Sequence, residues 1–230
     1  MFGDTMYKLH NNPILYPYQT TLLSLFCTSP FGKPFFFTGG TALSAFYLAH
    51  RESQDLDFFS FKPFDTLALR TTMQEIAEKT NSTMTIHIRS QTYNEILLEN
   101  KKEGWTQKID IVQEQPKHFG DIVYIDSIPV DSLVNIATNK ILAVFGRLEP
   151  KDYIDLFVIF TQTDFSFDEM FVLAKQKDTG LSKFHFANTI ADVDKFETLP
   201  KMKIPFDKNA FVKFYQEISH NLLLQIKPNK

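Results

Sequence analysis

A glycine pair followed by an Asp-x-Asp pair constrains the fold of this chain more than any other feature. Phe35–Thr38 is a short β-prone run, and Gly39-Gly40 after it lets the backbone turn sharply with no side chain in the way of a ligand. Apolar residues then recur at helical spacing, and residues 55–59 form a second β-prone run. This order predicts a strand, a glycine turn, a helix and a second strand with two carboxylates on one face.

A glycine turn before a helix, followed by a strand with two carboxylates, can bind an anion next to a divalent cation. A helix after the glycines directs its first N–H groups towards the turn, where an anion binds well, and Thr41 is placed to cap that helix. Asp55 and Asp57 repel each other unless a cation lies between them or water screens both, and hard oxygen ligands favour Mg²⁺ or Mn²⁺. We therefore predict that Gly39, Gly40 and Thr41 bind nucleotide phosphates and that the two carboxylates bind a metal ion.

Each half of the pattern also has a plainer interpretation. A Gly-Gly pair alone is usually only a turn, and an Asp-x-Asp pair alone is usually a solvated strand edge. We favour the functional interpretation because the glycines close a strand, a helix of suitable length follows, and the carboxylates lie on the next strand between apolar residues.

The composition indicates an aromatic-rich core and excludes some classes of protein. Of the 230 residues, 24 are phenylalanine, and the hydrophobic share is 43%. The net charge of −3 argues against nucleic-acid binding over the whole surface, although Lys101-Lys102 and residues 227–230 are candidates for a local basic patch. A single cysteine, Cys27, rules out an intrachain disulfide and a cysteine-based zinc site. No secretory signal and no apolar run of about 18 residues is present, so we expect a cytoplasmic protein with no membrane partner.

The patterns predict an α+β fold in two parts. A mixed sheet with flanking helices is expected over residues 1–128, and a helical domain over residues 129–230, where helical spacing replaces alternation. The predicted strands are residues 35–38, 55–59, 83–89, 93–99, 105–112 and 121–125. Besides the helix after Gly40, the predicted helices are residues 18–26, 65–79, 131–145, one from residue 150, 167–176, 188–196 and 208–224.

Asp110 is a natural third carboxylate for the site. It interrupts a hydrophobic β-prone run, and burying a carboxylate costs stability unless another group pairs with it. We predict that its strand lies beside Asp55 and Asp57. The alternative, that Asp110 is an edge-strand charge paired with Lys108, stays open from the sequence.

The C-terminal part contains a second set of charged residues. Lys140 lies in mid-helix between apolar residues, where it is placed either to reach a triphosphate as a point charge or to lie exposed. Asp152 and Asp155 face broadly the same side of the next helix, and ordinary helix-dipole effects explain Asp152 as well as a functional role does.

Two blocks of sequence together resemble a known family. The first is Gly39-Gly40-Thr41-Ala42-Leu43 followed by Arg51-x-Ser53-x-Asp55-Leu56-Asp57-Phe58. The second is Asn139-Lys140-Ile141-Leu142-Ala143-Val144-Phe145-Gly146-Arg147 followed by Lys151-Asp152-Tyr153-Ile154-Asp155-Leu156. They resemble the AbiEii/AbiGii-type toxin nucleotidyltransferases, which usually have arginine where this chain has Lys151. The resemblance covers about residues 35 to 165.

The resemblance implies a polymerase-β-like nucleotidyltransferase core with a helical partner domain. It implies transfer of a nucleoside monophosphate from an NTP, with Mg²⁺ or Mn²⁺ as cofactor. In this hypothesis Asp55 and Asp57 hold a metal ion that bridges the phosphates, and Asp110 completes a second metal position and helps to deprotonate the acceptor hydroxyl. Lys140 neutralises triphosphate charge, and Asp152 orients Lys140 or the incoming nucleotide. The remaining predicted substrate-binding residues are Arg51 and Ser53, which brace the carboxylate strand, and Asp155.

The resemblance also implies partners. Many members are toxins of toxin–antitoxin or phage-abortive systems, and some transfer nucleotides to the acceptor end of tRNA. We therefore expect an RNA such as tRNA, or a protein, as acceptor and a cognate antitoxin as partner. One alternative is a catalytically inactive module of the same fold that binds nucleotide or antitoxin, and another is an NTP-using phosphotransferase. The sequence identifies neither the acceptor nor the preferred base.

Overall fold

The computed structural model describes residues 7–114 and 117–226, which fall into two compact units. The sheet unit consists of the described residues up to 49 together with those from 53 to 133, and the helical unit consists of residues 50–52 and 134–226. The division therefore lies after Leu133, where the sequence predicted it after residue 128. Residues 227–230, predicted as a possible basic patch, lie outside the described residues.

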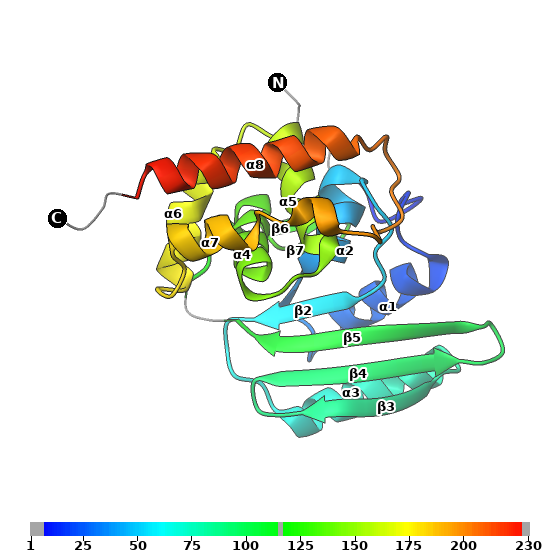
Figure 1. The fold of residues 1–230 in the computed structure, drawn as a ribbon. Coiled ribbons are helices and arrows are strands. Elements are labelled where there is room, and N and C mark those ends of the chain that lie inside the picture. The colour runs from blue at the N-terminus through cyan, green and yellow to red at the C-terminus, as the bar shows by residue number, and fades with distance from the viewer. Residues whose placement is uncertain (1–6, 115–116, 227–230) are drawn as a thin grey trace. The chain divides into compact units, whose positions relative to one another are not determined.

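The sheet unit is built on one mixed sheet of seven strands in the order β3-β4-β5-β2-β1-β7-β6. Figure 1 shows β2, β5, β4 and β3 in this order. The pairs β2–β5 and β1–β7 are parallel and the other pairs are antiparallel. The strands are β1 (Phe35–Thr38), β2 (Leu56–Ser60), β3 (Thr83–Arg89), β4 (Tyr93–Asn100), β5 (Trp105–Gln113), β6 (Val123–Ile125) and β7 (Ile128–Val130).

Phenylalanines form the centre of the sheet unit. Phe58 of β2 is buried, with ring centroids 4.2 Å from Phe26 and 5.5 Å from Phe37. Along β2 buried and half-buried residues alternate, so Phe58 faces the core while Asp57 faces the other side of the sheet. The helices of this unit are α1 (Pro17–Thr28), α2 (Gly39–Ala42), a π-helical continuation η1 (Leu43–Leu48) and α3 (Thr66–Lys79), and α3 packs against both α1 and β3.

The helical unit contains five α-helices among its described residues, and α8 packs against α5 and α7. Its core includes Tyr215, whose buried hydroxyl donates to the carbonyl oxygen of Tyr153 at 2.6 Å. Residues 50–52 join this unit through an antiparallel bridge between Arg51 and Met202. The helices are α4 (Leu133–Gly146), α5 (Pro150–Gln162), α6 (Phe167–Lys177), α7 (Lys183–Thr189) and α8 (Lys208–Leu224), with a 3₁₀ turn, η2 (Val193–Lys195).

The predicted α+β fold is confirmed, but some predicted elements are wrong. A helix over residues 188–196 is absent: α7 ends at Thr189, and only the short η2 follows. The strand β7 was missed because Pro129 resembled a breaker, yet Val130 next to it pairs with both β1 and β6. Among the residues that the structure describes, no helix is long and apolar enough to cross a membrane.

The packing of Phe58 predicts a large stability effect. Phe58→Ala should lower the free energy of unfolding of the sheet unit by about 3–5 kcal/mol, because it removes a fully packed ring and leaves a cavity. Trp105, the single tryptophan, is 9% exposed in β5, so its fluorescence during urea unfolding reports on this unit. Tyr124→Ala is the control, since Tyr124 is 72% exposed and should change stability by about 0.5 kcal/mol or less. Equal losses for the two variants would contradict this core assignment.

Candidate active site

The glycine turn lies directly against Asp57. Antiparallel pairing of β1 with β2 sets Thr38 opposite Asp57, so the turn that follows Thr38 begins beside this carboxylate. Gly39 has φ +75°, a left-handed conformation that side chains disfavour. A Cβ atom added to Gly39 would lie 2.1 Å from Oδ2 of Asp57. Glycine is therefore required at this position for two reasons: its positive φ and the close approach of the Asp57 carboxylate.

The third residue of the motif, Thr41, has a bracing contact. Its side chain is fully buried, and its hydroxyl donates to Oγ of Ser53 at 2.8 Å. Ser53 comes two residues before Asp55, so this bond fixes the segment that leads into the carboxylate strand. The helical run starts at Gly39 rather than with Thr41 as its cap. Because the Thr41 hydroxyl is bonded to Ser53, the backbone N–H groups of the glycine turn are the better candidates for a phosphate contact.

Three carboxylates lie in one row across the sheet. Asp57 of β2 is in parallel register with Asp110 of β5, and Asp110 is opposite Glu95 of β4. Paired residues on neighbouring strands point to the same face, and such strands are about 4.8 Å apart. Asp55 precedes the first residue of β2 by one position, on the same side as Asp57 by alternation. The predicted convergence of the Asp110 strand with the Asp-x-Asp strand is therefore present.

Asp110 is nevertheless bonded to groups of the chain itself. Lys108 Nζ lies 2.8 Å from Oδ2 of Asp110, and the Tyr93 hydroxyl donates to Oδ1 at 3.1 Å. Lys108 is also 3.6 Å from Glu95. The pairing with Lys108 that the sequence left open is thus formed, although β5 lies inside the sheet and not at its edge. Among the described residues, no group of three or more His, Cys, Asp or Glu side chains is arranged to hold a metal ion.

The protonation of these partners is well defined. Partial burial lowers the pKa of Lys108, but its hydrogen bond to Asp110 and the charges of Asp110 and Asp55 outweigh burial, so the pKa lies above its ordinary value. Burial and the charge of Asp110 raise the pKa of Tyr93 to about 12. Lys108 is therefore an ammonium and Tyr93 a neutral hydroxyl donor at neutral pH.

In the helical unit, Lys140 lies between two buried carboxylates. Its Nζ is 2.7 Å from Oδ1 of Asp152 and 2.6 Å from Oδ2 of Asp155. Burial alone would lower the pKa of Lys140, but the charges of Asp155 and Asp152 raise it above its ordinary value. Burial would raise the pKa of Asp155, yet the charges of Lys140 and Arg51 hold it well below its ordinary value. The lysine is therefore neither exposed nor neutral.

Asp155 is held from its other side by His50 and Arg51. The Arg51 guanidinium forms a two-pronged contact, with Nε 2.6 Å from Oδ1 and Nη2 2.8 Å from Oδ2 of Asp155. His50 Nε2 lies 2.7 Å from Oδ1. Burial, the largest effect, lowers the pKa of His50 in spite of the carboxylate, so the ring is neutral and donates its N–H. Arg51 was predicted to brace the carboxylate strand. The structure shows it in an ion pair with buried Asp155, within the helical unit.

Several site residues were missed from sequence. His50 fits the apolar helical spacing after Gly40, which hides its polar role, and the sequence does not show which strand lies beside Tyr93 and Glu95. Arg147, whose Nε is 2.7 Å from Oδ2 of Asp152, was only part of a quoted block. Alternation on the strand of residues 93–99 was the one available signal, since it places Tyr93 and Glu95 on the same face.

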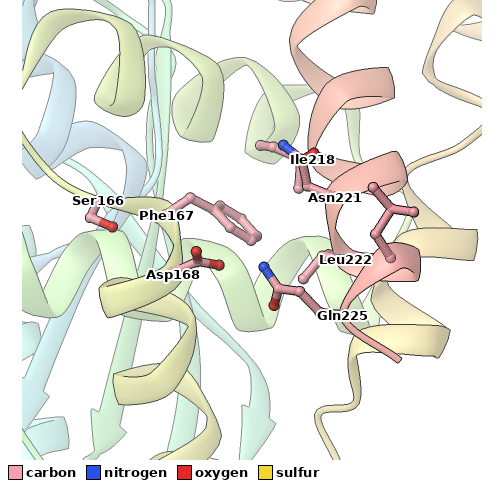
Figure 2. Close-up of a pocket in the computed structure, with 8 residues that line it drawn as sticks. Ser166, Phe167, Asp168, Ile218, Asn221, Leu222 and Gln225 are labelled. Carbon is pink, nitrogen blue, oxygen red and sulfur yellow. The ribbon is translucent and has the colours of Figure 1, made fainter. Parts of the chain in front are cut away.

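A surface pocket of about 370 Å³ lies elsewhere in the helical unit, between the start of α6 and the end of α8 (Figure 2). It contains none of the predicted site residues. No basic side chain lines it, so it lacks the charge that a triphosphate requires. The lining residues are Ser166, Phe167, Asp168, Ile218, Asn221, Leu222, Leu224 and Gln225.

Comparison with solved structures shows the same fold in nucleotidyltransferases. A putative nucleotidyltransferase from Helicobacter pylori is 17% identical, with a TM-score of 0.57 over 90% of this chain and 94% of that one. The protein JHP933 from H. pylori is 17% identical, with a TM-score of 0.54 over 89% and 90% of the two chains. MenT4, a nucleotidyltransferase toxin from Mycobacterium tuberculosis H37Rv, is 14% identical, with a TM-score of 0.55 over 90% and 82%. No curated protein gives a significant match.

The mixed sheet, with its glycine turn against an Asp-x-Asp strand, agrees with the polymerase-β-like nucleotidyltransferase fold that the two sequence blocks resemble. The family model described as nucleotidyl transferase AbiEii toxin, type IV toxin–antitoxin system, matches residues 21–222. The chain belongs to this family of toxin nucleotidyltransferases, as the two sequence blocks indicated.

Gly39→Ala should damage the site as well as the fold. The substituted residue must adopt φ +75° and its Cβ must displace the Asp57 carboxylate, so we expect a loss of about 2 kcal/mol or more together with weaker NTP binding. Gly104→Ala is the matched control: its φ is +73°, but nothing lies within 4 Å of the added Cβ. Urea unfolding followed by Trp105 fluorescence and NTP titration would test both variants. Equal behaviour of the two would show that the approach to Asp57 is unimportant.

Arg51→Lys should destabilise the helical unit. A lysine keeps the charge but cannot reproduce the two-pronged contact with buried Asp155, so we expect a loss of about 2 kcal/mol. Arg147→Lys should cost about 0.5 kcal/mol or less, because Arg147 is 55% exposed and solvent screens its ion pair with Asp152. Hydrogen exchange of the α5 amides measures both losses. Unchanged protection in Arg51→Lys would argue against the assigned role of the ion pair.

Proposed function

We propose that this chain transfers a nucleoside monophosphate from an NTP to a hydroxyl group of an RNA such as tRNA, or of a protein, in a reaction that depends on Mg²⁺ or Mn²⁺. The close approach of Gly39 to the Asp57 carboxylate is the observation that supports this proposal most strongly. It puts backbone N–H groups suited to phosphate beside a carboxylate suited to a metal ion. Nucleotidyl transfer requires both.

The donor set at Asp55 and Asp57 fits a hard divalent cation. Mg²⁺ in nucleotide enzymes is usually held by one or two carboxylates together with substrate phosphates, so a cage built entirely from protein side chains is not required. The Asp57 carboxylate takes the place that a Cβ at residue 39 would need, so the carboxylate lies directly against the glycine turn. When bound, such an ion would neutralise charge that develops on the phosphate oxygens.

The chain's own groups have distinct tasks in this proposal. The backbone of Gly39 and Gly40 would bind the β- and γ-phosphates by hydrogen bonds. Lys140, kept charged by Asp152 and Asp155, would offset phosphate charge, and Asp152 would hold its ammonium in place. Asp155 would act through Lys140, because its oxygens bind Lys140, Arg51 and His50.

The bond changes balance without a redox partner. The acceptor hydroxyl oxygen forms a bond to the α-phosphorus, the bond from that phosphorus to the bridging oxygen of the β-phosphate breaks, and pyrophosphate leaves. The hydroxyl proton is lost to solvent. Asp110, predicted from sequence to take part in that deprotonation, accepts hydrogen bonds from Lys108 and Tyr93 on its two oxygens, which leaves it poorly placed to receive the proton.

A cognate antitoxin is the proposed protein partner. The chain's family is described as a toxin of type IV toxin–antitoxin systems, and MenT4 is named a nucleotidyltransferase toxin. Growth arrest on expression of this chain, reversed by a protein encoded next to it, would support that role.

Asp57→Asn should abolish transfer while leaving the fold intact. It removes the charge that binds a cation but keeps the size of the side chain, so incorporation of label from α-³²P NTPs into total RNA or lysate protein should fall at least about a hundredfold. Asp121→Asn, at an exposed position of the sheet unit, is the matched control.

The position of the label separates this function from its alternatives. Label from the α-phosphate on the acceptor supports nucleotidyl transfer, and label from the γ-phosphate supports a phosphotransferase. If the wild type binds NTP in a thermal-shift assay but labels no acceptor with either NTP, the inactive binding module is the better description. Full transfer by Asp57→Asn would refute the assigned site.

A further inference from the structure

A buried carboxylate separate from Asp55 and Asp57 lies beside the start of the glycine turn. Asp131 directly follows β7, where Val130 is in parallel register with Phe37 of β1. The backbone N–H of Asp131 donates to the carbonyl oxygen of Phe37 at 2.9 Å. Asp131 is fully buried, and a buried carboxylate costs stability unless other groups of the protein bind it. Its partners therefore indicate its role.

The side chain of Asp131 binds the residue from which the glycine turn starts. The Thr38 hydroxyl donates to Oδ2 of Asp131 at 2.6 Å, and Thr38 directly precedes Gly39. Thr38 is 2% exposed, so water competes little for this bond. Thr38 also occupies the capping position of the helical run that begins at Gly39, yet its side chain makes no capping bond. The hydroxyl is directed to Asp131 instead.

Two further segments of the sheet unit hold Asp131 itself. His118 Nε2 lies 2.8 Å from Oδ1 of Asp131, and the His118 ring makes an edge contact with Phe36, with centroids 5.5 Å apart. The Tyr47 hydroxyl donates to the backbone carbonyl oxygen of Asp131 at 2.6 Å. Each carboxylate oxygen therefore contacts a different segment, so the carboxylate cannot rotate without breaking a contact.

The start of the turn lies between two carboxylates. In the sheet, β1 has β2 on one side and β7 on the other. On the β2 side, Thr38 is opposite Asp57, and the Asp57 carboxylate lies against Gly39. On the β7 side, Asp131 binds the Thr38 hydroxyl. The backbone that leads into Gly39 is therefore fixed from both neighbouring strands.

From these contacts, and resting on the nucleotide-binding function proposed above, we propose that Asp131 is a positioning residue for the phosphate-binding turn. It acts through the Thr38 hydroxyl, whose bond fixes the backbone at residue 38 and with it the direction of the Gly39 and Gly40 N–H groups. His118 keeps the carboxylate in the orientation that Thr38 requires. Asp131 touches neither nucleotide nor metal ion. A turn that is already ordered before binding loses less conformational entropy when phosphate binds, so affinity is higher.

Paired threonine variants test this role by nucleotide binding. Thr38→Val removes the hydroxyl and keeps the branched shape, whereas Thr38→Ser keeps the hydroxyl. The probe is whichever of the four non-cleavable α,β-methylene NTP analogues binds the wild type most tightly with Mg²⁺, measured by isothermal titration calorimetry. We expect Thr38→Val to bind it at least about tenfold more weakly, and Thr38→Ser within about threefold of the wild type.

Thr80→Val is the matched control for a purely structural effect. The Thr80 hydroxyl donates to the carbonyl oxygen of Ile76 at 2.8 Å, in the same unit but in α3 and its end. The substitution is identical to that at residue 38, so urea unfolding followed by Trp105 fluorescence should show a loss of stability. Affinity for the analogue should stay within about twofold of the wild type, because Thr80 has no bond to the turn.

Asp131→Ala tests the other end of the bond. It should weaken binding about as much as Thr38→Val does, and the double variant should bind no more weakly than the weaker single variant. Such non-additivity is expected because both substitutions remove the same interaction. If Asp131→Ala does not fold, the two Thr38 variants still decide the matter.

The turn can also be observed without nucleotide. The chain has only eight glycines, so labelling with ¹⁵N-glycine gives a small set of amide signals in nuclear magnetic resonance. The ¹H–¹⁵N heteronuclear Overhauser effect of Gly39 and Gly40, which reports backbone rigidity, should fall in Thr38→Val and Asp131→Ala. It should keep its wild-type value in Thr38→Ser and Thr80→Val.

Wild-type affinity in both Thr38→Val and Asp131→Ala would overturn the proposal, and so would an equal loss in Thr38→Ser. If Asp131 only supports the helix that begins at Leu133, its variant will lose stability with affinity and glycine rigidity unchanged, which also overturns it. Failure of the underlying function gives a different pattern. The wild type itself then binds none of the analogues, while the glycine signals still show whether Asp131 orders the turn.

Discussion

The register of β2 between β1 and β5 is the constraint on which the rest of the sheet unit depends. It sets Asp57 opposite Thr38 on one side and opposite Asp110 on the other. A slip of one residue would exchange the two faces of β2, burying Asp57 in the aromatic core and exposing Phe58. Burial of a phenylalanine contributes roughly 1.5–3 kcal/mol, so the core fixes the register and the register fixes the site. Phe58 thus determines the position of the neighbouring carboxylate although it faces away from it.

Much of this arrangement could be predicted because it depends on local sequence. The run Phe35–Thr38, the glycine turn and the alternation around Asp57 are patterns within a few residues, and β1 forms with the bounds expected. The positive φ of Gly39 follows from the same signal. The partner of β2 was also predictable in kind, since a carboxylate in a hydrophobic β-prone run needs a polar neighbour, and Asp110 is in register with Asp57.

The partners of individual side chains were less predictable, because they depend on contacts between distant segments. Arg51 precedes the carboxylate strand, so bracing of that strand was the natural expectation, yet its partner Asp155 lies 104 positions further along the chain. Thr41 was predicted to bind phosphate together with the glycine turn, yet its hydroxyl is buried and donates to Ser53. His50 fits the apolar spacing of a helix, but the left-handed conformation of Ala49 ends the helical run before it. Spacing along the chain contains none of this information.

The helical unit and the sheet unit each contain a cluster of charged side chains. In the helical unit, Lys140, Arg51 and Arg147 contact the two carboxylates of Asp152 and Asp155, and His50 is neutral. Lys140, Arg51 and both carboxylates are buried, so each of these charges depends on its partners. On the sheet unit, carboxylates outnumber the single ammonium of Lys108, which suits a cation.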